Sequence, residues 1–311
     1  MKKIVSVLLA IALCVGACFS FAACGAESNG DSFTVGVCQL MEHESLDKAT
    51  NGFVDALKAE MEKAGKTVTV DVQVAGGIDL CNTVVNAFTA KRVDLIMGNA
   101  TPALLAAANA TTSIPVLGTS VTDYADTFAG NIPSNVTGTS DAVPFDEQAK
   151  MMIESLGLVS GDQVGVIYCL NESNSKIQYE AVKALFEEKG IVVKAYTFSE
   201  TTELQAVTTA AATECKAIYI PSDNTVADND STVGTICNEK NVPVYTSYGG
   251  AICYASLAID YYQLGYETGI MAAQILLGEK TPADIAVKTL TPTVTYNEEL
   301  CGQLGITIPE N

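Results

Sequence analysis

The hydrophobic positions of this chain alternate between two patterns from about residue 34 to the C-terminus. Short apolar runs typical of buried strands are followed by longer segments whose apolar residues recur at helical spacing. In the first half the pattern predicts strands at residues 34–38, 68–74, 94–97 and 114–117, and helices at residues 45–64, at residues 80–90 and from Thr101 onward. This order is typical of a parallel sheet covered by helices on both faces.

The same order of elements begins again after residues 135–139. It predicts strands at residues 163–168, 191–196, 217–220 and 242–245, and helices at residues 147–156, 183–188, 204–212 and 226–239. A strand at residues 257–260, a helix at residues 261–277 and short strands near Ala286 and Val294 complete the chain. We therefore predict an α/β protein with two doubly wound lobes, the first with residues 33–138 and 261–280, the second with residues 139–260 and 281–311. Ligands bind such sheets at the carboxyl ends of the strands, so a cleft between the lobes is expected.

The N-terminus has the pattern of a secretion signal. Two lysines precede an apolar run at residues 4–21, and small residues lead to Cys24. This arrangement is typical of a bacterial lipoprotein signal at residues 1–23, after which Cys24 would carry a diacylglycerol and residues 24–32 would form a polar linker. Cys18 is an alternative lipidation site, and an uncleaved membrane helix is the alternative interpretation of the apolar run.

The charge balance excludes several classes of partner. Removal of the signal takes away two lysines and no acid, which leaves 15 basic and 36 acidic residues and a formal net charge of −21. Such a field disfavours binding to nucleic acid or polyphosphate. Arg92 is the only arginine, so a bidentate guanidinium contact to a ligand carboxylate is almost excluded. Hydroxyls, amides or helix N-termini must then bind any anionic group.

The residues that usually carry catalysis or bind metals are sparse. Apart from Cys24, the mature chain has seven cysteines without C-x-x-C spacing, and we expect buried free thiols rather than disulfides or zinc ligands. His43 is the only histidine, and the pattern offers it no partner for a Cys-His or Ser-His-Asp arrangement. An enzyme is therefore disfavoured, and no metal or cofactor is expected.

Polar residues gather immediately after the predicted strands, where the carboxyl ends of parallel strands meet at one edge. The candidates in the first half are Gln39, Glu42, Thr101, Ser120, Thr122, Asp123, Ser140 and Asp141. The candidates in the second half are Asn171, Glu172, Ser173, Asn174, Asp223, Asn224 and Asp260. Helix capping explains any one of them equally well, although the run at residues 171–175 is denser than capping requires.

These residue types suit a zwitterionic amino acid. The predicted helix start at Thr101-Pro102, with threonine as N-cap, offers a hydroxyl and free amides to a carboxylate. Asp223, Asp141 or Asp260 offers an acceptor to an ammonium group. The candidates for the apolar walls of the site are Leu40, Met41 and Tyr248.

Several stretches carry a resemblance to a known family. They are residues 35–43, 94–96, 100–103, 114–116, 121–123, 135–141, 172–175, 223–225 and 260–265. In this order they resemble the substrate-binding proteins of ABC transporters typified by tryptophan- and tyrosine-binding lipoproteins. Residues 76–78, Gly-Gly-Ile, and Tyr124 depart from the family pattern. The resemblance implies a type I periplasmic-binding fold, closure on a small ligand, and delivery to a permease driven by a cytoplasmic ATPase.

We therefore expect a monomeric, lipid-anchored receptor on the extracytoplasmic face of the cell membrane, which binds an aromatic amino acid for an ABC importer. The alternatives are a sensor of the same fold that presents a small molecule to a signalling partner, and a receptor for another kind of solute. A transcription factor of this fold would begin with a helix-turn-helix, where this chain has a signal sequence.

Overall fold

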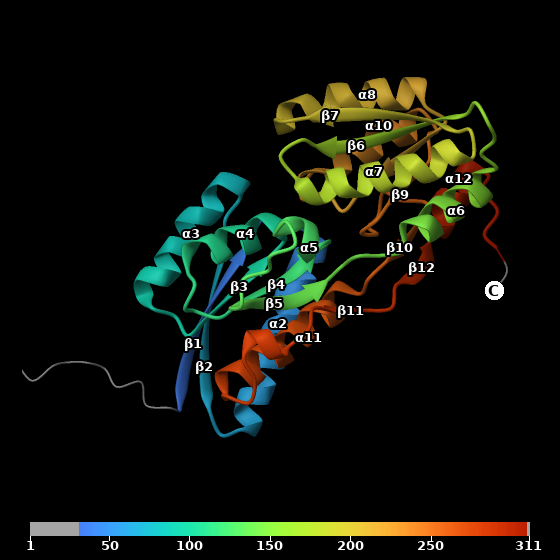
Figure 1. The fold of residues 1–311 in the computed structure, drawn as a ribbon. Coiled ribbons are helices and arrows are strands. Elements are labelled where there is room, and N and C mark those ends of the chain that lie inside the picture. Colours follow the sequence, from blue (N-terminus) through green and yellow to red (C-terminus); the bar gives the residue numbers. More distant parts are fainter. Residues whose placement is uncertain (1–30, 310–311) are drawn as a thin grey trace, which may run out of the picture.

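The computed structural model describes residues 31–309, which form two α/β lobes joined by crossing segments (Figure 1). The sheet of the first lobe has the strand order β11-β5-β4-β3-β1-β2, and its strands pair in parallel. These strands are β1 (Ser32–Gln39), β2 (Thr67–Val74), β3 (Leu95–Asn99), β4 (Val116–Val121), β5 (Val136–Ser140) and β11 (Lys288–Thr289). The parallel order brings the carboxyl ends of β1, β3, β4 and β5 to one edge of the sheet.

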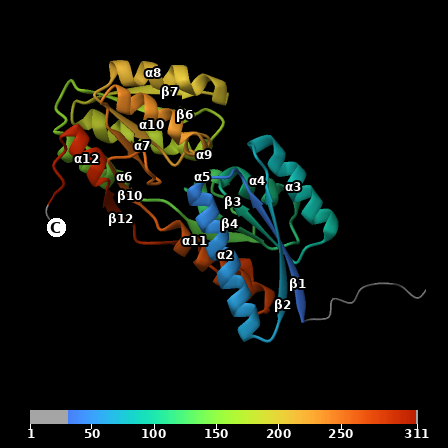
Figure 2. The same cartoon turned by 180° about the vertical axis from the view of Figure 1, so that it is seen from behind.

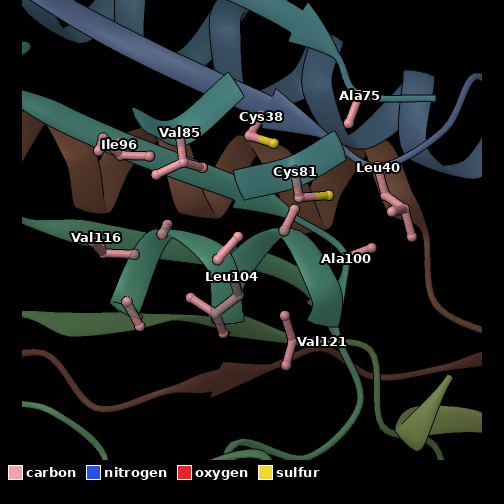
Figure 3. Packing of buried hydrophobic residues seen from close by; sticks show 14 of the residues in the cluster. Cys38, Leu40, Ala75, Cys81, Val85, Ile96, Ala100, Leu104, Val116 and Val121 are labelled. Atoms are coloured by element: carbon pink, nitrogen blue, oxygen red, sulfur yellow. The ribbon is translucent and has the colours of Figure 1, made fainter. Parts of the chain in front are cut away.

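Helices cover both faces of this sheet, because its buried strands point alternate side chains to opposite faces. On β3, Ile96 packs into the cluster with α3 (Ile78–Lys91) and α4 (Thr101–Ala110), whereas Leu95 and Met97 pack into the cluster with α2 (Glu44–Lys63) and α11 (Tyr261–Leu276). Figure 3 shows the first of these clusters, in which Cys38 and Cys81 lie among aliphatic side chains. The helices of this lobe are α2 (Glu44–Lys63), α3 (Ile78–Lys91), α4 (Thr101–Ala110), α5 (Tyr124–Thr127) and α11 (Tyr261–Leu276).

The second lobe repeats this architecture with the strand order β12-β10-β9-β8-β6-β7, in which only β12 runs antiparallel to its neighbour. Its strands are β6 (Gln163–Cys169), β7 (Val192–Phe198), β8 (Ala217–Ile220), β9 (Val244–Thr246), β10 (Ala255–Ala258) and β12 (Thr293–Tyr296). Its helices are α6 (Phe145–Leu156), α7 (Ser173–Glu188), α8 (Leu204–Glu214), α9 (Asn224–Asp228), α10 (Asp230–Glu239) and α12 (Glu298–Leu304), with short 3₁₀ helices η1 (Thr201–Glu203) and η2 (Pro282–Asp284). The predicted fold class, two doubly wound α/β lobes, is confirmed.

The helix α11 returns the chain to the first lobe and lies directly against α2 (Figure 2). Glycines make this close approach possible. A Cβ atom placed on Gly265 would lie 1.8 Å from the carbonyl oxygen of Ala49, and one placed on Gly52 would lie 2.0 Å from the carbonyl oxygen of Tyr262. The two helix backbones are therefore in contact, which fixes α2, and with it the N-terminus of α2, relative to the crossing segments.

Three of the differences between the structure and the sequence predictions bear on the architecture. The single helix predicted at residues 226–239 is two helices, α9 and α10, that break at Asn229. Thr101 is the first residue of α4 and not its N-cap, because Ala100, with a φ of 87°, occupies the cap position. Lys288 and Thr289 pair with β5 in the first sheet, whereas we expected residues 281–311 in the second lobe. This pairing covers the edge of β5 that would otherwise be open.

The cysteines within residues 31–309 are free and buried, as the sequence predicts. The predicted signal at residues 1–23, Cys18 and Cys24 lie outside the described residues. No helix within the described part combines the length and the apolar character needed to cross a bilayer.

Candidate ligand-binding site

A cavity lies between the two lobes at the carboxyl ends of their strands. The lobes leave little space in it, with a volume of only about 10 Å³, which is room for about one water molecule. The residues that line it are His43, Ser45, Leu46, Ser120, Thr122, Asp141, Asn174, Ser222, Asp223, Asn224, Ala227, Tyr248 and Tyr261. Residues of both lobes and of the segments that cross between them therefore line one site, as the fold predicts.

Asp141 follows β5 and presents a buried carboxylate to this cavity. The Thr122 hydroxyl donates to its Oδ1 at 3.1 Å, and the Tyr261 hydroxyl donates to its Oδ2 at 2.9 Å. Burial raises the pKa of Asp141, and these two hydroxyls oppose the rise. The carboxylate has no cationic partner among the described residues. An ammonium group of a ligand would supply the missing charge.

Three buried polar atoms around the cavity have no hydrogen-bond partner among the described residues. They are Ser120 Oγ, Asn174 Oδ1 and the Tyr248 hydroxyl. Such atoms are rare in folded proteins, because an unpaired buried polar group loses its bonds to water without compensation. Their presence together at one cavity marks the place where a polar ligand would complete the hydrogen bonding.

The orientation of the Asn174 amide is fixed by its neighbours. Its Nδ2 donates to the carbonyl oxygen of Ser222 at 2.8 Å and to Glu172 Oε2 at 3.2 Å. Since both partners can only accept, the amide nitrogen must face them, and the unpaired atom is the carbonyl oxygen Oδ1. Asn174 therefore offers the cavity a hydrogen-bond acceptor.

Ser120 occupies an irregular end of β4. The register between β4 and β5 shifts between Gly118 and Val121, and Ser120 has a φ of 56°, in the left-handed region that non-glycine residues seldom adopt. This backbone conformation lies at a residue whose hydroxyl is unpaired and lines the cavity, so the strain coincides with a candidate ligand contact.

The N-terminus of α2 also reaches the cavity, through His43, Ser45 and Leu46. His43 stands at the N-cap position but makes no side-chain bond to the first turn of the helix. Its Nε2 instead lies 3.3 Å from Oδ1 of Asn224 in the opposite lobe. The uncapped amides of a long helix carry partial positive charge and suit an anionic group.

The cavity has an acidic lining. It includes Asp141 and Asp223 but no lysine or arginine, and burial lowers the pKa of His43. A ligand with an uncompensated negative charge is therefore disfavoured, whereas one with an ammonium group is favoured.

Asp223 and Glu172 are occupied by the protein itself. Asp223 Oδ1 accepts from the Val226 amide at 2.9 Å, and its Oδ2 accepts from the Cys169 amide at 2.7 Å and the Ser175 hydroxyl at 2.8 Å. Burial, together with the nearby Glu172, raises the pKa of Asp223 to about 8. These bonds support the capping explanation of Asp223, because both of its carboxylate oxygens are engaged by donors of its own lobe.

Glu172 accepts from the backbone amides and the side chains of both Asn224 and Thr225, at 2.7 to 2.9 Å. Together with Asp223 it anchors the start of α9 to the end of β6. This buried network holds Asn174 and Asn224 in place at the cavity.

The remaining candidates from the sequence lie away from the cavity lining. Gln39 is buried inside the first lobe, where Thr50 donates to it and it donates to Met41 and Asp47. Asp123 and Asp260 cap α5 and α11 through single backbone amides, as the alternative explanation predicts. Three of the other candidates are exposed: Glu42 at the mouth of the cleft, Asn171 and Ser173. Thr101 is buried at the start of α4. The Ser140 hydroxyl donates to the Thr122 carbonyl and accepts from the Ala142 amide.

Sequence reasoning missed several residues that line the cavity. They are His43, Ser45, Leu46, Ser222, Ala227 and Tyr261; Tyr248 was predicted only as a candidate wall. The available signal for His43, Ser45 and Leu46 was their position soon after the first strand. The candidate residues were chosen for the same reason, namely that they follow a predicted strand. No group of three or more potential metal ligands occurs in the described part of the chain.

Comparison with known proteins identifies the family. A family model described as "ABC transporter substrate binding protein" matches residues 34–311. The chain belongs to this family. This ABC substrate-binding protein is 33% identical over 276 residues to the tyrosine-binding protein of Clostridioides difficile strain R20291, a match that covers 85% of this chain and 79% of the relative. The resemblance seen in the sequence is thereby confirmed, and the family is one of binding proteins rather than enzymes.

Two solved structures bear on the arrangement of the lobes in this ABC substrate-binding protein. A Streptococcus pneumonia domain in complex with L-tryptophan is 33% identical, with a TM-score of 0.81 and coverage of 88% of this chain and 96% of the other. The ligand-free, open structure of a Clostridium difficile substrate-binding protein with adhesive properties is 31% identical, with a TM-score of 0.67 and coverage of 90% and 97%. The TM-score is higher for the tryptophan complex than for the ligand-free, open structure.

Proposed function

We propose that this ABC substrate-binding protein binds an aromatic amino acid between its lobes and delivers it to the permease of an ATP-driven importer. In this proposal the protein acts as a monomer, held at the extracytoplasmic face of the membrane by a lipid on Cys24. Family membership supports the role in transport. The tyrosine-binding relative and the tryptophan complex support the choice of ligand.

One observation carries the assignment of the site: three buried polar atoms without partners surround a cavity that also contains an uncompensated carboxylate. We assign the ligand ammonium to Asp141 and to Asn174 Oδ1, both of which are acceptors. A charge-assisted hydrogen bond to a desolvated carboxylate is the strongest contact that this cavity offers.

We assign the ligand carboxylate to the Ser120 hydroxyl and the N-terminus of α2. Ser120 has an unpaired hydroxyl to donate, and the first turn of α2 has no side-chain cap. This replaces the carboxylate site expected at Thr101, because Thr101 does not line the cavity. The helix dipole and the hydroxyl together substitute for the arginine that the chain lacks there.

The remaining walls suit an aromatic side chain. Leu46, Ala227 and the rings of Tyr248 and Tyr261 are the apolar surfaces of the cavity. The volume left between them, about 10 Å³, is far too small for an amino acid, so the lobes must separate to admit the ligand. Closure would then remove the ligand from water, which strengthens its charged contacts.

Ligand class is tested by thermal unfolding of the chain from Cys24 onward in the presence of each common amino acid. An aromatic amino acid should stabilise the protein by ~2.7 kcal/mol at a hundredfold excess over its dissociation constant. A sugar or peptide that stabilises the protein when no amino acid does would contradict the assignment.

Anchoring is tested separately by Cys24→Ala, which should abolish incorporation of labelled fatty acid. Continued labelling would point to Cys18.

A further inference from the structure

Gln178 connects the two lobes next to the proposed ammonium site. It lies on α7 of the second lobe, fully buried, and its Nε2 is 3.3 Å from Thr122 Oγ1 in the first lobe. Its Oε1 accepts from the backbone amide of Ser222 at 3.0 Å. Thr122 in turn donates to Asp141 at 3.1 Å. These four residues form one continuous chain of hydrogen bonds across the cleft.

The direction of every bond in this chain is determined by its two ends. The backbone amide of Ser222 can only donate, so the carbonyl of Gln178 must face it and the amide nitrogen of Gln178 must face Thr122. An amide nitrogen can only donate, so Thr122 Oγ1 accepts from Gln178. The hydroxyl proton of Thr122 is then directed to Asp141, whose carboxylate can only accept.

We propose that Gln178 is a positioning residue that couples closure of the lobes to recognition of the ligand ammonium. Its bond to Thr122 joins the lobes, so it forms only when they approach each other. On closure it orients the Thr122 hydroxyl toward Asp141 and so stabilises the ionised carboxylate as that group leaves water. The acceptor for the ammonium is thereby completed when the ligand is enclosed. This inference rests on the proposed function of the site.

A double-mutant cycle tests the coupling, with L-tyrosine as the titrated ligand and the chain from Cys24 onward as the protein. Gln178→Met keeps the length of the side chain but removes both its amide donor and the carbonyl oxygen that accepts from Ser222, and Thr122→Val removes the hydroxyl. Each change should weaken tyrosine binding about tenfold, the effect of losing a hydrogen bond that supports a charged group. Both changes break the same chain of hydrogen bonds. The double variant should therefore bind tyrosine at most about twofold more weakly than the single variant with the lower affinity.

Thr122→Ser is the matched conservative variant, since it keeps the hydroxyl and should retain tyrosine affinity within about twofold. The melting temperature of each unliganded variant shows whether it is folded. A purely structural role of Gln178, bracing Ser222, predicts that Gln178→Met weakens binding by the same factor in both backgrounds. That result, or unchanged affinity in Gln178→Met, would overturn the inference and leave the proposed function standing. A wild-type chain that binds no aromatic amino acid would overturn both.

Discussion

Two buried aspartates illustrate why residue type alone does not identify the site. Asp141 and Asp223 each follow a strand and each line the cavity. The oxygens of Asp223 are occupied by two backbone amides and a hydroxyl of its own lobe, whereas Asp141 is contacted by the hydroxyls of Thr122 and Tyr261. The sequence could place both at a strand end, but the direction of the side chain and its partners depend on packing between segments far apart in the chain.

Asp141→Asn should abolish tight binding without unfolding the protein. An amide cannot neutralise the ammonium, so the affinity for tyrosine should fall by ~2 kcal/mol or more, about thirtyfold in the dissociation constant. The unliganded melting temperature should stay the same or rise, because the variant buries no uncompensated charge. Calorimetric titration and thermal unfolding measure the two effects. Asp123→Asn, at an aspartate that caps α5 away from the cavity, is the control and should leave affinity unchanged.

Asp223→Asn, unlike Asp141→Asn, should destabilise the unliganded protein. The amide nitrogen of the new side chain would face either the Cys169 amide or the Val226 amide, both of which donate, so one buried hydrogen bond is lost. The free energy of unfolding should fall by ~1–3 kcal/mol. Asp260→Asn is the control, because Asp260 is exposed and asparagine caps a helix as well as aspartate does. Equal destabilisation by both variants would contradict the buried network.

The raised pKa of Asp223 also predicts a pH dependence. The folded protein holds this proton up to about pH 8, whereas the unfolded chain loses it near the ordinary value of 3.8. The folded state therefore binds more protons between these values, and its stability should fall as the pH rises from about 4 to about 8. Urea unfolding across this range should show a smaller slope in Asp223→Asn than in the wild type. A wild-type stability that increases over the range would contradict the shift.

At the scale of elements, the alternation of apolar runs predicts most strands and helices to within a few residues, because the central strands are buried on both faces and most helices on one. It fails where a local feature competes with periodicity. The break between α9 and α10 falls at Asn229, between two aspartates that favour caps over helix interiors. A short strand near Ala286 is predicted, but the pairing of β11 with β5 in the first sheet depends on the return of the chain through α11, which no local pattern predicts.

The contact between α2 and α11 gives a prediction at this scale. Gly265→Ala would place a methyl group against the backbone of Ala49 and should destabilise the protein by ~2 kcal/mol. Gly302→Ala is the matched control, since Gly302 lies in α12 with open space around it, and it should raise stability by roughly 0.5 kcal/mol. Chemical denaturation measures both, and an equal response would mean that the helices do not pack through their backbones.

At the scale of the whole molecule, the sequence predicts a cleft between two lobes but not how far the lobes are closed. The interlobe bonds of His43 with Asn224 and of Gln178 with Thr122 belong to a closed arrangement. They join residues more than fifty positions apart in the sequence, and no local sequence pattern predicts such contacts. The narrowness of the cavity follows from the same closure.

Closure should be visible in solution. Because the ligand must enter an open cleft and is then enclosed, the radius of gyration from small-angle X-ray scattering should be larger without ligand and should decrease when L-tyrosine is added. Asp141→Asn should show the larger value at the same tyrosine concentration. An identical radius with and without saturating tyrosine would contradict a closure driven by the ligand.

The central claim is that the cavity holds an aromatic amino acid through its zwitterionic group. Calorimetric titration of L-tyrosine into the wild-type chain from Cys24 onward tests it most directly. The account predicts one binding site per chain, with a dissociation constant in the micromolar range or tighter, and negligible binding of desaminotyrosine, which lacks the ammonium group. Absence of binding by tyrosine, tryptophan and phenylalanine, or equal binding of desaminotyrosine, would contradict it.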